Sequence, residues 1–328
     1  MKYLVLLILG AAATAACGLV DEDMRDCETD YHIDYELKLV TNLTTELRTQ
    51  LSMEADISVA EALESYLDGI FADYAHDVDL SFYDVQGDSA RLHHESHIMD
   101  ASQSSYTLYI PVRQYMHLAV ANLKDNSIMA LKDDEHCHTS RIVQQVKDTL
   151  PPHRAGLFTA RLPMNVQENV DQQFDVQLYM ANCAAALVVD TLGSHIKDLK
   201  VYMTGFATDF DIRDSSYRFS YTPVMETDPV VLKNPGYMCF ASVVFPSRDL
   251  EETKAESSSL WHIAICAILP DGKITRTVLG IPDPLCAGHV SVIEAKAQEN
   301  GQVAPGDPSV GVSVTLDWLP GIEQEIPL

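Results

Sequence analysis

The residue with the clearest chemistry is Cys17, which follows the small residues Thr14, Ala15 and Ala16. Small side chains directly before a cysteine look like a bacterial lipobox, in which the thiol receives a diacylglyceryl group before the preceding segment is cleaved. Cleavage and N-acylation would leave Cys17 as the first residue, carrying several acyl chains. A single chain holds a protein only marginally, at about 0.8 kcal/mol per buried CH₂, so several chains make a lasting anchor. We therefore expect Cys17 to be lipidated.

The segment before Cys17 fits an export signal. Lys2 supplies a positive charge, residues 4–9 form an apolar core, and residues 11–16 are small. This order is typical of a secretory signal peptide, and the run is shorter than the roughly 20 residues that span a bilayer. A buried N-terminal helix is the alternative, but nothing polar follows at helical spacing. We predict a signal peptide over residues 1–16.

An acidic segment follows the lipidated cysteine. Residues 21–23 read Asp-Glu-Asp and resemble the export tag that sends some bacterial lipoproteins to the outer face of the outer membrane. Gly18 stands where many inner-membrane lipoproteins have Asp. An ordinary solvated linker is the alternative reading. We predict that residues 17–30 form a lipidated acidic linker and that the protein is anchored by lipid to the bacterial outer membrane, exposed at the cell surface.

Two histidine-rich segments are the candidates for metal binding. The first contains His93, His94 and His97, and the second is residues 133–138, which read DDEHCH. Neighbouring residues of a strand point to opposite faces, and neither segment has the ligand spacing of a zinc site. The second also lacks the alternating oxygens and the glycine of an EF-hand loop. We expect solvated loops at both places and no metal or other cofactor.

Motifs of common enzymes are absent from the sequence. It contains no G-x-S-x-G, H-E-x-x-H, Walker or dinucleotide-binding motif. Because the chain has 48 acidic residues, any two could be nominated as a glycosidase pair, and such a pair indicates nothing. The sequence therefore predicts a protein that is not an enzyme.

Cysteines and hydroxyl residues suggest further modification. Six cysteines remain after Cys17, and their 15 connectivities cannot be distinguished from the sequence. None forms a CxxC pair, and Cys183 and Cys266 lie in apolar runs, where a cysteine acts as a small core residue. Three triplets, at 88–90, 148–150 and 190–192, look like bacterial O-glycosylation acceptors. Only the first lies in a predicted turn, which makes Ser89 the candidate acceptor.

Composition sets the class of protein and excludes some partners. The chain has 328 residues, 47% of them hydrophobic, which is enough for one large core or two ordinary ones. Its net charge of −26 argues against binding to nucleic acid or directly to an anionic membrane surface. The charge suits a protein held near a membrane by lipid.

The hydrophobic periodicity of the sequence predicts the strands and the helix that would position these residues. Residues 31–40 alternate as a strand, with Ile33, Tyr35 and Leu37 on one face. Ser58, followed by Glu61, resembles a capping box at the start of a helix. The apolar stripe of this helix comprises Ala62, Leu63, Tyr66, Leu67, Ile70, Phe71 and Tyr74. Apolar residues at this spacing predict a helix with one buried face.

Short strands dominate the rest of the sequence. Residues 78–92 and 105–123 predict two strand pairs, the second bent at Pro111, and residues 140–150 predict a short helix before two prolines. Beyond residue 160 helical periodicity nearly disappears, and strands separated by turns are typical of β-sandwiches. We predict an N-terminal sandwich over residues 31–160 and a C-terminal sandwich over residues 161–328.

Several of these features occur in an order that resembles the fimbrillin-A associated anchor proteins, the lipidated base subunits of bacterial type V pili. They are Cys17 and Cys27 around an acidic spacer, the strand IDYELKL, a helix, and the C-terminal segment VSVTLDWLPGIEQEIPL. The family's F-D-x-x-G and A-W-x-N strand patterns correspond to residues 83–87 and 118–122. The second domain departs from the family, with LYMANCAAALVV where members often begin a strand with Arg.

The resemblance implies a mainly β fold of two transthyretin-like β-sandwich domains, with one helix inserted in the N-terminal domain. It also implies a mechanical role. Type V pilus subunits join when a strand of one subunit fills a groove in its neighbour, and shaft subunits lose a leading strand to open that groove. An anchor that keeps Cys17 lipidated should keep its leading strand, so the fibre would end at it. The expected partner is a pilus shaft subunit.

The resemblance makes the C-terminal tail the candidate for contact with that partner. The apolar residues of this possible strand-exchange tail are Val312, Val314, Leu316, Trp318, Ile322 and Ile326. In the alternative reading the tail is the last strand of its own sheet, which we favour for residues 312–318. For residues 322–328 both readings stay open.

The function that the sequence predicts is that of a lipid-anchored structural subunit, which attaches a surface pilus to the outer membrane and ends its assembly. The alternative is a surface lipoprotein that binds a glycan or a peptide. That alternative needs an exposed aromatic platform, and only Trp261 and Trp318 are available as tryptophans. Both lie in alternating, strand-like sequence.

Overall fold

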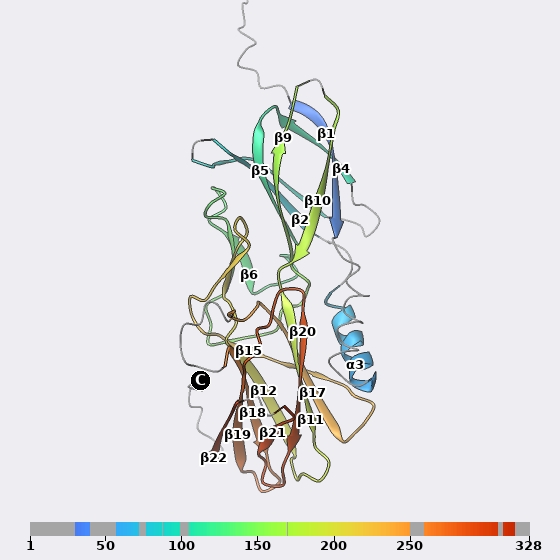
Figure 1. Cartoon of the computed structure of the whole chain (residues 1–328), viewed down its shortest axis with the longest axis vertical. Helices are drawn as coiled ribbons and strands as arrows, with labels where there is room; N and C mark the ends of the chain where they lie inside the picture. The colour runs from blue at the N-terminus through green and yellow to red at the C-terminus, as the bar shows by residue number, and fades with distance from the viewer. Residues whose placement is uncertain are drawn as a thin grey trace, which may run out of the picture.

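Two lobes are stacked along the long axis of the molecule, and the described helix lies against the lower lobe (Figure 1). The structure is a computed structural model of the whole chain. It describes residues 30–39, 57–71, 77–86, 88–98, 105–168, 170–249, 259–307 and 311–318. We call the upper lobe the N-terminal sandwich and the lower lobe the C-terminal sandwich.

The N-terminal sandwich is built from a seven-stranded sheet in the order β3-β2-β5-β9-β10-β1-β4. Its strands are β1 (Asp30–Leu39), β2 (Asp77–Asp84), β3 (Arg91–Ile98), β4 (Ser105–Pro111), β5 (Gln114–Ala121), β9 (Phe158–Asn165) and β10 (Gln172–Met180). β10 pairs with β1 along most of its length and with β9 only at Tyr179 and Met180. The sheet therefore divides at β10 into two layers, as strands that change sheets do in a sandwich.

Alternating side chains fill the space between these layers. Leu80 and Phe82 of β2, Leu108 of β4 and Val176 and Leu178 of β10 are buried in one apolar cluster. Residues at alternate positions of a strand share one face, so these strands turn that face inward. β4 and β5 follow each other in sequence but do not pair, because β4 lies beside β1 and β5 lies between β2 and β9.

Three sheets make up the C-terminal sandwich. The five-stranded sheet has the order β16-β17-β11-β20-β21, the six-stranded sheet β22-β19-β18-β12-β15-β8, and the four-stranded sheet β14-β13-β7-β6. The five-stranded sheet contains β11 (Cys183–Asp190), β16 (Asp228–Val230), β17 (Tyr237–Val244), β20 (Val290–Ala297) and β21 (Val303–Pro305). The six-stranded sheet contains β8 (Thr149–Leu150), β12 (Asp198–Thr204), β15 (Val224–Glu226), β18 (Trp261–Ile268), β19 (Ile274–Ile281) and β22 (Gly311–Trp318). The four-stranded sheet contains β6 (Met129–Lys132), β7 (Arg141–Gln144), β13 (Asp209–Asp211) and β14 (Ser216–Arg218).

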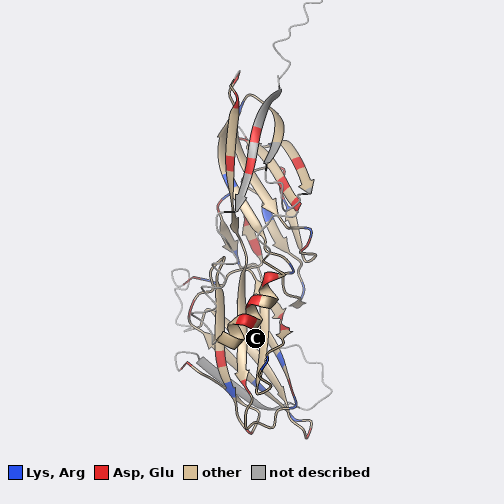
Figure 2. Cartoon of the chain, turned by 90° about the vertical axis from the view of Figure 1, so that its right-hand side faces the viewer, with Lys and Arg blue, Asp and Glu red and all other residues tan. Residues whose placement is uncertain are grey.

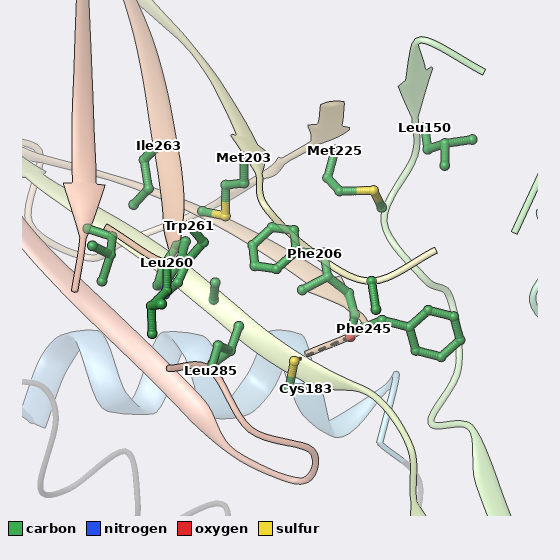
Figure 3. Close-up of a cluster of buried hydrophobic side chains, with 14 of the residues drawn as sticks. Leu150, Cys183, Met203, Phe206, Met225, Phe245, Leu260, Trp261, Ile263 and Leu285 are labelled. Atoms are coloured by element: carbon green, nitrogen blue, oxygen red, sulfur yellow. Dashed lines mark hydrogen bonds between the residues drawn. The ribbon is translucent and has the colours of Figure 1, made fainter. Parts of the chain in front are cut away.

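The core of the C-terminal sandwich gathers around Trp261, which is fully buried (Figure 3). Its indole Nε1 donates a hydrogen bond of 2.9 Å to the carbonyl oxygen of Asp283. Phe206 lies 5.6 Å from the indole between ring centroids, and Ile263 belongs to the same cluster. A buried indole that has found its hydrogen-bond partner is a stable core residue, so Trp261 is not an exposed platform.

Gly205 allows the chain to pass close to this tryptophan. Its φ angle is +101°, and a Cβ atom there would lie 2.7 Å from the Cα of Trp261. Only glycine combines that backbone conformation with so close an approach. Packing around Trp261 therefore depends on the absence of a side chain at Gly205.

The strand β11 explains the long apolar run CAAALVV. Ala185 and Leu187 face the core around Trp261, whereas Ala184 and Ala186 belong to the cluster that contains the helix. The strand is therefore buried on both faces, which is why its sequence does not alternate.

The helix α3 (Ile57–Asp68) buries Val59, Leu63 and Leu67, as the apolar stripe predicts. It follows β1 in sequence but packs on the C-terminal sandwich beside β17 and β11 (Figure 1). Tyr66 Oη donates a 2.8 Å hydrogen bond to Asp228 Oδ2 at the edge of that lobe. The opposite face of the helix carries acidic side chains toward solvent (Figure 2).

The prediction of a mainly β protein with two sandwiches is confirmed, and the described residues contain one helix. The prediction of a short helix over residues 140–150 is wrong, because residues 141–144 form β7 and pair with β6 and β13. Short helices are marginal by themselves, so pairing with these strands prevails. The predicted domain boundary after residue 160 falls inside β9. β9 and β10 pair with β5 and β1, but β7 and β8, which precede residue 160, pair with β13 and β15 of the C-terminal sandwich, so one boundary in the sequence does not separate the two sandwiches.

Candidate functional site

The leading strand β1 occupies an interior position in the N-terminal sandwich. It pairs in parallel with β10, from Ile33 opposite Gln172 to Leu39 opposite Leu178. On its other side it pairs antiparallel with β4, from Asp30 opposite Pro111 to Glu36 opposite Ser105. Main-chain hydrogen bonds therefore hold β1 on both edges.

β4 depends on β1 for its place in the sheet. Within the described residues β1 is the only strand with which β4 pairs. Leu108 and Ile110 of β4 are nevertheless fully buried in the core. Removal of β1 would therefore leave a slot between β10 and β4, with unpaired backbone on both sides and apolar side chains below it.

The outward face of β1 is acidic and polar. Asp34 is exposed and Glu36 is half-buried, as the predicted alternation requires. Gln173 Nε2 of β10 lies 3.3 Å from Glu36 Oε2, so a side-chain hydrogen bond joins the two parallel strands on that face. Asp175 lies opposite Glu36 in the register. The strand thus presents charge to solvent, whereas β10 and β4 supply the apolar core.

The last described strand, β22, lies at the far end of the molecule from β1 (Figure 1). Its backbone pairs antiparallel with β19, with Trp318 opposite Ile274 and Val314 opposite Thr277. It is an edge strand of the six-stranded sheet. Val312, Val314, Leu316 and Trp318 therefore lie in a strand of their own sheet, which is the reading favoured from the sequence. Ile322 and Ile326 lie outside the described residues.

Of the predicted modification sites Cys17 and Ser89, only Ser89 lies within the described residues. Cys17 lies outside the described residues, so its lipidation stays a prediction. Ser89 is half-buried, with a φ angle of +61°, and its carbonyl oxygen accepts a hydrogen bond from the amide of Cys137. The loop over residues 133–139 therefore covers part of the turn that contains Ser89. Its glycosylation also stays a prediction.

The histidines of β3 contact two different carboxylates rather than one shared centre. His93 Nε2 and His97 Nε2 lie 2.6 and 2.8 Å from the two carboxylate oxygens of Glu95, all on one face. His94 Nε2 lies 2.7 Å from Asp79 on the other face. Among the described residues, no group of three such side chains could hold a metal ion.

Two hollows flank the edge strand β16. One, of about 460 Å³, lies against β12 and β17, and the other, of about 480 Å³, lies between β16 and α3. Cys239 lines the first, but burial raises the pKa of its thiol to about 12. A thiol that remains protonated is a poor nucleophile. Among the described residues that line the two hollows, no histidine lies near a nucleophile.

The sequence identified the strand β1 but not its neighbours. Alternation predicts a strand, and it says nothing about which strands lie beside it. The pairing of β1 with β10 joins residues separated by more than a hundred positions, and no local signal marks it. In the described part of the chain, no helix has the length and apolarity needed to span a bilayer.

Comparisons with known proteins agree with this architecture. The family model of the fimbrillin-A associated anchor proteins Mfa1 and Mfa2 matches residues 26–232, which is more than half of the chain. The fimbrial anchor protein Mfa2 from Porphyromonas gingivalis is similar in structure at 8% identity, with a TM-score of 0.51, and the match covers 88% of this chain and 98% of that one.

Two further solved structures have the same TM-score of 0.51. A candidate adhesin from Bacteroides thetaiotaomicron is 10% identical over 86% of this chain and 98% of its own. A candidate adhesin from Bacteroides ovatus is 10% identical over 90% of this chain and 96% of its own. At these identities the likeness shows a shared fold. No curated protein matches the sequence.

Proposed function

Because the chain belongs to the family of fimbrillin-A associated anchor proteins and is thus a pilus-associated protein, we propose that it attaches a pilus to the outer membrane and ends the fibre there. In this proposal the lipid on Cys17 holds the protein at the cell surface. The partner is a pilus shaft subunit. The single observation that carries the proposal is the interior position of β1.

A subunit whose slot between β10 and β4 is filled by its own β1 cannot accept a donated strand there, as expected of the last subunit of a fibre. β1 already supplies the main-chain hydrogen bonds that a donated strand would make, with β10 on one side and β4 on the other. Strand addition needs a free edge and free side-chain pockets. A subunit that keeps β1 therefore offers no vacant place between these strands, and no further subunit can join there.

The position of Cys17 favours retention of that strand. Thirteen peptide steps separate Cys17 from Asp30, the first residue of β1, and they span at most about 45 Å. A lipid on Cys17 would thus keep the N-terminal sandwich close to the membrane. Because lipid and β1 belong to one continuous chain, loss of β1 by cleavage would also release the protein from its anchor.

The opposite end of the molecule supplies the proposed contact with the fibre. β22 is an edge strand whose described partner is β19. Residues 319–328 continue beyond it and contain Ile322 and Ile326. We propose that this tail contacts the shaft subunit, at the end of the protein that points away from the lipid.

Replacing the lipidated residue tests the proposal. In cells, Cys17→Ala should release the protein and its attached fibres into the medium, as immunoblots of medium and membrane fractions would record. Cys286→Ala is the matched control, because Cys286 is exposed and lies in the other lobe. The control should leave the protein and its fibres on the membrane. Retention of the Cys17→Ala protein on the outer membrane would contradict the proposal.

A further inference from the structure

Three described segments carry the chain between the two sandwiches, and they meet at one place. They are residues 122–128 between β5 and β6, residues 151–157 between β8 and β9, and residues 181–182 between β10 and β11. We call the junction the set Asn122, Asn126, Arg154–Leu157 and Asn182. In many two-domain proteins such crossings are exposed linkers that let the domains move.

Asn126 ties the first crossing to the second. Its Oδ1 accepts hydrogen bonds from the amides of Arg154 and Ala155, at 2.9 and 3.2 Å. Its Nδ2 donates to the carbonyl oxygens of Asn122 and Ala155, at 3.0 and 3.2 Å. One side chain thus satisfies main-chain groups of both crossings.

Asn182 and Asn122 complete the connection. Asn182 Oδ1 accepts a bond from the amide of Leu157, and its Nδ2 donates to the carbonyl oxygen of Ala155, at 3.2 and 3.0 Å. Asn122 Nδ2 donates to the carbonyl oxygen of Gly156 at 2.9 Å. The third crossing is thereby joined to the second.

The turn that follows α3 also bonds to the junction. The amide of Gly156 donates to the carbonyl oxygen of Ile70 at 2.7 Å. Arg154 pairs at 2.5 Å with Asp228, the carboxylate that also accepts the hydroxyl of Tyr66. The helix therefore fastens the second crossing to the C-terminal sandwich from outside.

The three asparagines are out of contact with water. Asn122 is 4% exposed, Asn126 1% and Asn182 0%. A buried amide without partners is unfavourable by several kcal/mol, so each of these side chains is stable there only while the crossings stay in place. The apolar cluster beside them also runs from the N-terminal sandwich to the face of β11 under α3.

We propose that the junction locks the two sandwiches into one rigid body, so that they unfold together, with Asn126 as the central positioning residue. Any rotation between the lobes would separate Asn126 from the amides of Arg154 and Ala155 and leave buried groups unpaired. The lock does not depend on the proposed function. If the protein anchors a fibre, the lock would pass a pulling force between the lobes without a hinge.

Unfolding of the full chain in urea tests the lock. Tryptophan fluorescence follows the C-terminal sandwich through Trp261 and Trp318, and hydrogen exchange of the β2 and β5 amides, read by mass spectrometry, follows the N-terminal sandwich. In the unchanged protein the two midpoints should coincide. Separate midpoints would overturn the proposal without any variant.

Substitutions then test whether the junction residues make the two sandwiches unfold together. Asn126→Ala should separate the two midpoints, and Asn122→Ala, which removes one described side-chain bond to Gly156, should separate them less. Asn165→Ala, at an exposed position of β9, is the control and should leave them coincident. Coincident midpoints in Asn126→Ala would overturn the proposal. If that variant does not fold, Asn122→Ala alone decides, and coincidence there would overturn it equally.

Discussion

The first and last described strands are held in opposite ways. β1 lies inside its sheet, between β10 and β4, whereas β22 lies at the edge of its sheet and pairs with β19. Loss of an interior strand unpairs two neighbours and opens the core beneath them. Loss of an edge strand unpairs one neighbour and leaves the other strands in place. The difference indicates that the N-terminal strand is integral to its sheet, whereas the C-terminal strand is attached to its sheet along one edge only.

The largest expected effect comes from removing one strand or the other. A chain that begins at residue 40 should lose the folded N-terminal sandwich, because β4 would have no described partner and Leu108 and Ile110 would be uncovered. A chain that ends at residue 310 should keep both lobes folded. Circular dichroism and hydrogen exchange would measure both. If the N-terminal sandwich folds without β1, the expectation that its fold needs β1 more than the C-terminal sandwich needs β22 would be contradicted.

Two glycine substitutions test whether the stability of the C-terminal sandwich depends on the packing of its core rather than on β22. Gly205→Ala would place a Cβ 2.7 Å from the Cα of Trp261, and we expect a loss of about 2–4 kcal/mol in the free energy of unfolding. Gly193 has a similar φ of +80° but open space around it, so Gly193→Ala should lose only about 1 kcal/mol. Urea unfolding followed by Trp261 fluorescence compares them, and equal losses would show that backbone conformation alone matters.

Acid should weaken the protein through two buried histidines. Burial lowers the pKa of His117 in β5 to about 4 and that of His153 beside Phe245 to about 3. Both values lie below the ordinary 6.5, so the unfolded chain takes up protons first as the pH falls. Stability is therefore complete above pH 6.5 and is lost below it, by about 2 kcal/mol for each histidine at pH 5.

Replacing each histidine separates the two contributions. His153→Phe and His117→Phe should each flatten part of the fall in unfolding free energy between pH 7 and pH 5, as measured by urea titration. His153 should matter at least as much as His117, because neither of its ring nitrogens has a hydrogen-bond partner among the described residues, whereas His117 Nδ1 lies 3.0 Å from the carbonyl oxygen of Ser81. An unchanged pH dependence in both variants would contradict this origin of acid sensitivity.

The smallest effect is expected at the surface contact between α3 and the C-terminal sandwich. Lys233 Nζ lies 2.8 Å from Glu61, but both side chains are exposed, so solvent screens the pair. Lys233→Ala should leave the thermal midpoint unchanged. Tyr66→Phe, which removes the part-buried hydroxyl bonded to Asp228, should lower it. A larger effect from Lys233 would mean that surface charge, rather than buried contacts, holds the helix.

Local elements of this fold could be read from the sequence. Alternation identified β1, and the helical stripe identified α3. Each signal lies within a few residues of the element that it forms. The family resemblance is confirmed by the family match over residues 26–232, and the anchor role stays a proposal.

Non-local arrangements could not be read in this way. The place of β1 between β10 and β4, the packing of α3 on the other lobe and the bonds of Asn126 all join distant positions. Asparagine is common in turns, and nothing in its neighbours tells a buried junction residue from an exposed turn. The run CAAALVV is typical of a strand buried on both faces, but it does not indicate which elements cover those faces.

Hydrogen exchange of β1 tests most directly whether the protein ends the fibre with its own strand in place. It would be measured in the full-length lipidated protein, alone and bound to purified pilus shaft subunits. If the protein ends the fibre with its own strand in place, the β1 amides should exchange as slowly as those of β10 in both samples, while new protection appears only in residues 311–328. If β1 loses protection when the shaft subunit binds, the slot accepts a foreign strand, and the account of a terminal subunit is contradicted.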